Sequence, residues 1–402
     1  MLETSVNSNS KTSVFSVFKT FLKLGLTSFG GPVAHLSYFR KELVERQKWV
    51  NENQYSQLLA ICQFLPGPAS SQVGFALGLL RAGWFGAISA FIGFTLPSVI
   101  LLIAFASILP YLSGEMGIAA IHGLKLVTCA VVADAVWGMF NKLCPDITRR
   151  LLTLAVMCML LFVDSTWSQM FAVFVGALMG IWLCKQPEVE TENTINVHYS
   201  KKFGLMLFTI FTVLLLMFML VGGHDGLFTI AQIFYNAGAL VFGGGHVVLP
   251  LLQDSVVGTG LVGNEQFIAG YGASQAIPGP MFAFAAYLGA LIPVEQGPFL
   301  GVFVALIFIF LPGFLLVGAA LPLWQAVSHR RTAANAIAGV NAAVVGILAA
   351  VFYDPILTSA ISSLFDVAVA GIGFIMLMYF KRSPLLVVFW CIAMSMLSSY
   401  FY

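Results

Sequence analysis

The chain has 402 residues, of which 59% are hydrophobic and only 9% are charged, and its net charge is +2. Soluble domains carry about 25% charged residues, so the composition excludes an ordinary soluble protein, and the small net charge gives no sign of nucleic-acid binding. Apolar stretches follow one another almost continuously after position 55, without the alternating strands of a barrel, which predicts an all-α polytopic membrane protein.

The predicted elements divide the chain into five parts. Residues 1–12 form a polar tail without a cleavable signal pattern, which we expect to be cytoplasmic. Residues 13–184 form a first transporter repeat, and residues 185–202 form a polar cytoplasmic linker. Residues 203–222 form a connecting transmembrane helix, and residues 223–402 form a second transporter repeat.

The two predicted repeats share motifs at a nearly constant spacing. Phe-Gly-Gly at 29–31 recurs 213 residues later at 242–244, and Gln-x-x-Pro-Gly-Pro at 63–68 recurs 212 residues later at 275–280. The single connecting helix inverts the second copy, and inverted repeats are the usual construction of secondary transporters. The same register continues further along the chain, where Leu96-Pro97 matches Leu311-Pro312 and Gly123 matches Gly339.

The distribution of charged residues predicts the orientation of the two repeats. Residues 40–52 carry four Lys or Arg side chains, whereas the matching residues 253–265 carry none. Because Lys and Arg concentrate in cytoplasmic loops, we expect the first segment to be cytoplasmic and the second to be periplasmic. This pattern favours re-entrant hairpins at 15–39 and 55–80; the alternative is that both segments span the membrane, which gives about thirteen crossings.

The repeated motifs have a chemical consequence at membrane depth. Proline lacks a backbone donor and glycine permits unusual dihedral angles, so each motif breaks a helix. The first amides after a break are free and carry the positive end of the helix dipole, which suits an anion. Inverted repeats bring such breaks together near the midplane, where secondary transporters bind substrate. The alternative is that the breaks only shape helix packing.

The candidate site consists of the break residues and the polar residues near them. We predict that the structural breaks are Pro32, Pro66, Pro68, Pro278 and Pro280. The candidate substrate-binding residues are the break glycines, the polar residues after Pro68, the repeated glutamines, two histidines and one lysine. These are Gly30, Gly31, His35, Gln63, Gly67, Ser70, Ser71, Gln72, Lys125, Gly243, Gly244, His246, Gln275 and Gly279.

The ionisable candidates each have a structural alternative. His35 and His246 lie just beyond the two glycine breaks but are not aligned with each other, so each is either a site residue or a satisfied structural histidine. Lys125, whose counterpart is Asn341, lies in a long apolar segment. Its ammonium either supplies countercharge for a dianion or reaches toward the membrane surface.

The motifs also resemble a known family. Phe-Gly-Gly-Pro-Val-Ala-His at 29–35, Trp49 downstream, Cys-Gln-Phe-Leu-Pro-Gly-Pro at 62–68 and the second Pro-Gly-Pro at 278–280 resemble the chromate ion transporter family over both halves of the chain. The resemblance implies a multi-pass carrier of the bacterial inner membrane that exports chromate and gives chromate resistance. It also implies that sulfate, a tetrahedral dianion of similar size, competes.

Other functions remain as alternatives. A transporter of sulfate or another small oxyanion fits the same motifs, whereas a passive anion channel requires a more continuous polar pore. An enzyme is disfavoured because no metal-ligand pair or nucleophile set recurs, and we expect no cofactor and no metal. The expected partners are the anion and the lipid bilayer, and the sequence leaves a homodimer open.

Overall fold

The computed structural model describes residues 13–29, 31–112, 114–162, 168–184, 195, 197, 199–221, 226–242, 245–328 and 331–401, and these contain helices and turns but no strand. The predicted tail, most of the linker, and the candidates Gly30, Gly243 and Gly244 lie outside the described residues. The all-α fold is confirmed, and the helices are those of a polytopic membrane protein.

The first half of the chain contains several short helices before the long ones. Polar side chains cap the amide ends of two of them: Ser13 accepts from Phe15 N–H, and Asn51 forms a capping box with Gln54. The elements are α1 (Val14–Thr27), α2 (Gly31–Phe39), the π-helical turn η1 (Arg40–Arg46), α3 (Glu52–Phe64), α4 (Ala69–Ile108), η2 (Leu109–Tyr111), α5 (Glu115–Leu143), α6 (Ile147–Phe162), α7 (Ser168–Leu183) and α8 (Lys201–Leu220).

The second half repeats this order. Its elements are α9 (Leu227–Leu240), η3 (Gly245–Val247), α10 (Val248–Val256), α11 (Asn264–Ala276), η4 (Met281–Ala283), α12 (Phe284–Leu291), α13 (Pro298–Ser328), α14 (Arg331–Val351), η5 (Phe352–Leu357), α15 (Thr358–Ala360), α16 (Leu364–Met378) and α17 (Pro384–Phe401). Short helices α9 to α12 again precede the long α13 and α14, as α1 to α3 precede α4 and α5.

The predicted breaks interrupt the helices where the motifs stand. Helices α1, α3, α9 and α11 have 13 or 14 residues each and end directly before a break. A helix needs about 20 residues to cross the hydrocarbon core, so none of these four crosses by itself. Five longer helices of the described chain, at 69–111, 115–143, 201–220, 298–323 and 334–360, are long and apolar enough to cross.

Helix α4 bends sharply after its first thirteen residues. A straight helix of its 40 residues would be about 60 Å long, roughly twice the hydrocarbon thickness. Ala82 and Gly83 leave the helical conformation, with Gly83 at φ +67°, so α4 consists of arms 69–81 and 84–108. The arms pack closely, since a Cβ on Gly78 would lie 2.5 Å from the Gly86 carbonyl oxygen.

Contacts between the ends of the broken segments show that the segments are hairpins. The Arg81 guanidinium, at the end of the first arm of α4, lies 5.6 Å from the Trp49 ring, just before α3. A spanning α3 and first arm of 26 residues would instead separate these ends by about 39 Å. In the second half the Tyr287 hydroxyl of α12 donates to the carbonyl of Gln266, near the start of α11, at 2.8 Å. Both Pro-Gly-Pro segments therefore turn back, as the re-entrant prediction requires.

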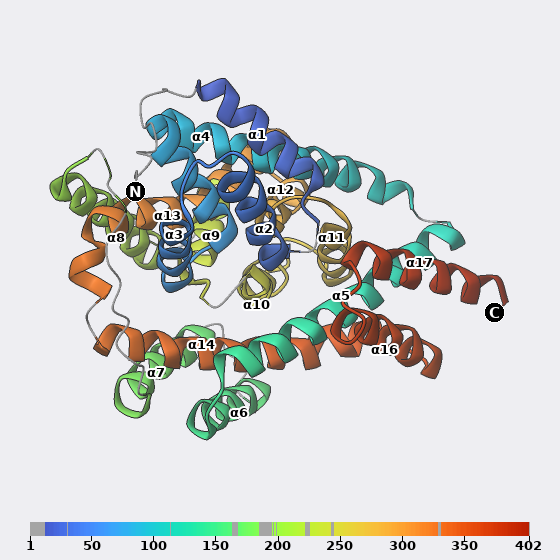
Figure 1. The fold of residues 1–402 in the computed structure, drawn as a ribbon. Helices are drawn as coiled ribbons and strands as arrows, with labels where there is room; N and C mark the ends of the chain where they lie inside the picture. The colour runs from blue at the N-terminus through green and yellow to red at the C-terminus, as the bar shows by residue number, and fades with distance from the viewer. Residues whose placement is uncertain are drawn as a thin grey trace.

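The helices form two groups. Helices α1 to α4 and α8 to α13 pack together, whereas α5, α6, α7, α14, α16 and α17 form a separate layer that runs along the bottom of Figure 1. The long helices α5 and α14 contact the first group through α11, η3 and α10. All four breaks lie in the first group, so this group holds the candidate site.

Candidate functional site

Two backbone hydrogen bonds join the breaks of one half to those of the other. The Gly67 N–H donates to the Val241 carbonyl at 2.7 Å, and the Gly279 N–H donates to the Ser28 carbonyl at 2.9 Å. The two donors are 212 residues apart and the two acceptors 213 apart, the spacings of the repeated motifs. We call this pair the crossed hydrogen bonds. They place each Pro-Gly-Pro turn against the helix end that precedes the Phe-Gly-Gly motif of the other half.

The two Pro-Gly-Pro turns require glycine for conformation and space. Gly67 has φ +116° and Gly279 has φ +100°, a region that side chains with a Cβ rarely adopt. Each glycine packs on a long helix of the other half: Gly67 on Gly313 of α13, and Gly279 on Ser98 of α4. These two contacts follow the motif Leu-Pro in each half, so the close approach is itself repeated.

Side-chain hydrogen bonds hold the two turns in different ways. The Gln72 Nε2 donates to the Pro66 carbonyl at 2.8 Å and to the Gly313 carbonyl at 3.3 Å. In the other turn the Ser98 hydroxyl donates to the Pro278 carbonyl at 2.7 Å. Gln72 therefore positions the first turn from within its own half, whereas Ser98 positions the second turn from the opposite half.

The glycine breaks also meet. A Cβ on Gly245 would lie 3.1 Å from Pro32 Cγ, and these two residues occupy the same position of the repeated motif. Equivalent residues contact each other only near an axis that relates the two halves. The predicted meeting of the breaks is therefore present in the fold.

The meeting helix ends provide donors for an anion. The carbonyls of Val241 and Ser28, at the carboxyl ends of α9 and α1, accept the crossed hydrogen bonds and are therefore satisfied. Helix α4 begins at Ala69 after Pro68, which provides no side-chain cap, so its first amides have no partner within the helix. The exposed dipole end at this place is the positive one.

The two histidines have different environments. The His35 ring is 1% exposed, packs 5.3 Å from the Phe94 ring and has an unpartnered Nδ1. The His246 Nδ1 instead lies 2.7 Å from the Tyr271 hydroxyl. The two side chains are therefore not equivalent, as their misaligned positions in the motifs predict.

The polar candidates near the Pro-Gly-Pro turns are not all buried together. Ser70, Ser71 and Gln72 are buried in the first turn of α4, at most 4% exposed. Gln275 is buried, but its counterpart Gln63 is exposed, so the repeated glutamines do not share one environment. Sequence repetition alone therefore does not identify an equivalent pair of polar site residues here.

Lys125 requires a correction. Its Nζ donates to Glu265 Oε1 at 2.8 Å, at the start of α11, and this hydrogen bond and the positive charge lower the pKa of the Glu265 carboxyl. The Glu265 side chain is 79% exposed. Ten residues of α11, about 15 Å, separate Glu265 from Gln275 beside the break. The structure thus provides a paired ammonium near the surface, and not the buried countercharge at the breaks that the sequence suggested.

Sequence reasoning missed two residues that contact the second turn. Ser28 directly precedes the Phe-Gly-Gly motif, and Ser98 directly follows Leu-Pro, so both stand beside motifs that were recognised. Neither residue is repeated in the other half, where Val241 and Gly313 stand. A search for repeated residues therefore overlooks them, whereas a search for polar residues adjacent to the motifs finds both.

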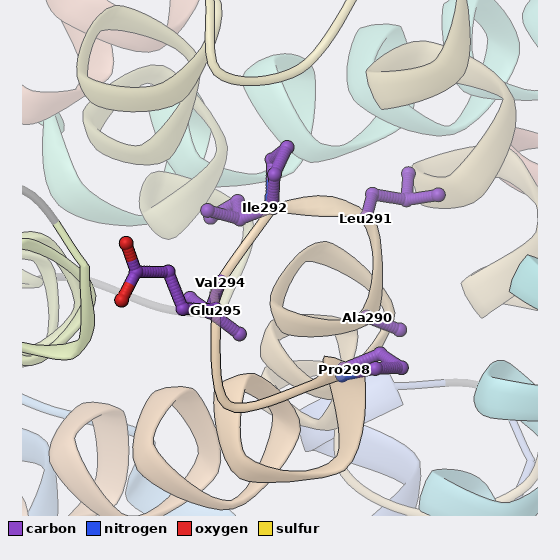
Figure 2. A pocket seen from close by; sticks show the side chains of 7 residues that line it. Ala290, Leu291, Ile292, Val294, Glu295 and Pro298 are labelled. Carbon is purple, nitrogen blue, oxygen red and sulfur yellow. The ribbon is translucent and has the colours of Figure 1, made fainter.

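Two cavities elsewhere do not suit an oxyanion. One, of about 410 Å³, follows α12 and is lined by apolar residues with the Glu295 carboxylate directed toward it (Figure 2). The other, of about 400 Å³, contains Asp254 and Asp354. A carboxylate repels a dianion, and neither cavity includes a break residue.

Comparisons with known proteins agree with the repeated architecture. The family described as "Chromate transporter" matches residues 15–181 and 228–396. A chromate transport protein of Pseudomonas aeruginosa is 28% identical over 84% of this chain and 80% of its own length. A chromate transport protein of Cupriavidus metallidurans is 25% identical over 81% and 78%, and an uncharacterised transporter of Methanocaldococcus jannaschii is 25% identical over 84% and 83%. No solved structure matches the chain. With matches across both halves, the chain belongs to the chromate transporter family.

Proposed function

We propose that the chain is a secondary carrier that exports chromate through the inner membrane of a bacterium and so gives chromate resistance. The crossed hydrogen bonds are the observation that carries this proposal, because they gather the broken helices of both halves in one place. Relatives over most of the chain are named chromate transport proteins.

In this proposal the anion binds at the broken-helix ends near the midplane. Each helix amino end acts as about half a positive charge, so several ends together offset much of a dianion's charge. The two halves lie in opposite orientations, with 40–52 in the cytoplasm and 253–265 in the periplasm. The charge difference between these segments supports that orientation.

The membrane potential favours export. Moving one charge across 100 mV changes the free energy by about 2.3 kcal/mol, so a dianion that leaves a negative cytoplasm gains about 4.6 kcal/mol. A saturable carrier is favoured over a passive channel, because the breaks pack against one another and neither cavity reaches them. Sulfate shares the shape and charge of chromate and is the competing substrate to test.

Flux measurements with the purified full-length chain in liposomes test this function. Chromate uptake should be saturable, should accelerate when the lumen is made positive, and should fall when unlabelled sulfate is added. Flux equal to that of empty liposomes would refute transport. Flux that increases linearly with concentration without saturating would replace the carrier with a channel.

A further inference from the structure

Four buried polar groups around the breaks have no hydrogen-bond partner. They are Ser28 Oγ, His35 Nδ1, Ser71 Oγ and Thr95 Oγ1, and their residues are 0%, 1%, 4% and 2% exposed. Buried polar atoms are nearly always paired, because an unpaired one costs stability. Four of them in one region therefore need an explanation.

Ser28 and His35 lie together beside the second Pro-Gly-Pro turn. The Ser28 carbonyl accepts from the Gly279 N–H at 2.9 Å, and one nitrogen of the His35 ring hydrogen-bonds the backbone of Ser28. The remaining nitrogen, Nδ1, is the unpartnered one. The same ring contacts Phe94 of α4, which brings it next to Thr95.

Thr95 faces the same turn from α4. Thr95 and Ser98 are three residues apart and so share a face of the helix. The Ser98 hydroxyl already donates to the Pro278 carbonyl, whereas the Thr95 hydroxyl has no partner. Thr95 therefore lies about one helical turn from the contact between α4 and the turn.

Ser71 lies at the level of His35. A Cβ on Gly74 would lie 3.4 Å from the Phe39 ring, so α4 packs on α2 at this level. Ser71 precedes Gly74 by one turn and His35 precedes Phe39 by one turn, and both helices lead away from a break. The Ser71 and His35 side chains are therefore on the break side of this contact.

The equivalent positions of the second half are apolar. Four buried hydrophobic side chains, none more than 1% exposed, replace the four polar ones: Val241 for Ser28, Val248 for His35, Ala283 for Ser71 and Phe310 for Thr95. Duplicated helices therefore form an interior that is polar on one side only.

We propose that the oxyanion site is one-sided, with Ser28, Ser71, Thr95 and His35 of the first half binding the oxygens. The inference rests on the proposed function and specifies its site. The three hydroxyls donate to a tetrahedral oxyanion. In the neutral ring Nδ1 accepts, because the other nitrogen donates to Ser28, so it pairs with the O–H of a singly protonated oxyanion. The second half contributes apolar walls that exclude water.

The test uses the purified full-length chain in detergent and measures chromate and sulfate affinity together with the melting temperature. The variants are Thr95→Val and Ser71→Ala, and the matched control is Thr153→Val. The Thr153 hydroxyl is also buried but donates to the Ala342 carbonyl at 2.9 Å, in the other helix group.

Loss of a hydroxyl donor to an anion should raise the dissociation constant about 10- to 100-fold in Thr95→Val and Ser71→Ala. Their ligand-free melting temperatures should stay level or rise, because an unpaired buried group is removed. Thr153→Val should show the reverse, with a lower melting temperature and unchanged affinity. Unchanged affinity in both test variants, or a loss of stability like that of the control, would overturn the one-sided site. Absence of chromate and sulfate binding to the wild type would instead refute the proposed function.

Discussion

Replacement of Gly279 by alanine tests the crossed hydrogen bonds most directly. The added Cβ would overlap Ser98 Oγ and lie 3.2 Å from the Phe94 carbonyl oxygen, at a φ of +100°. The unfavourable dihedral costs about 1–2 kcal/mol and overpacking about 1–3 kcal/mol, so the expected destabilisation is about 2–5 kcal/mol. The turn then moves away from Ser98, and we expect chromate flux to fall at least about tenfold, because a small misplacement of a binding group costs that much or more.

A second substitution separates the two parts of this cost. Gly67 faces Gly313 where Gly279 faces Ser98, so Ser98→Gly copies the arrangement of the first turn. Adding Ser98→Gly to Gly279→Ala should recover the packing part and leave the dihedral part. Gly67→Ala should be milder than Gly279→Ala, because its closest neighbour is the flexible Gln72 side chain at 2.9 Å.

Thermal unfolding of the purified variants and chromate flux in liposomes measure both effects. Gly114→Ala is the control, since this residue has φ −74° and a Cβ there meets nothing within 4 Å. A Gly279→Ala protein with the stability and flux of the control would show that the turn does not need glycine. No recovery from Ser98→Gly would show that the predicted overlap is not the cause.

Three further predictions follow from the structure. Single cysteines at Asn51 and Gly263 in a cysteine-free background should label from opposite sides, Gly263 from the periplasm; labelling of both from one side would contradict the inverted orientation. Lys125→Gln should change oxyanion affinity less than about twofold, and a double-mutant cycle with Glu265→Gln should give a coupling below about 1 kcal/mol, as for other exposed ion pairs; a tenfold loss of affinity in titrations would return Lys125 to the site. Gly339→Val should lower the melting temperature by separating α14 from α7, whose backbone a Cβ there would overlap; an unchanged melting temperature would refute this contact.

The sequence determined the character of the protein and the positions of its helix breaks. Hydropathy and low charge are local properties, so they predict membrane helices without knowledge of the fold, and the structure confirms them. Proline and glycine act on their own residues and immediate neighbours, so the breaks at 29–32, 65–68 and 277–280 could be placed from the motifs. The two Pro-Gly-Pro hairpins, one of two topologies that the sequence left open, are decided by contacts between segment ends.

Only the tertiary structure decided which breaks meet and which side chains are left without partners. The Gly67–Val241 hydrogen bond joins residues 174 positions apart, and no local pattern specifies such a pair. Lys125 has the sequence context of a buried countercharge, yet packing of α5 on α11 brings Glu265 within hydrogen-bond distance. Ser28 and Thr95 are ordinary helix residues by sequence, and they become distinctive only because the folded chain buries their hydroxyls without a partner. The physical reason is that burial and pairing depend on the neighbours that packing supplies, which a residue's own position in the chain does not specify.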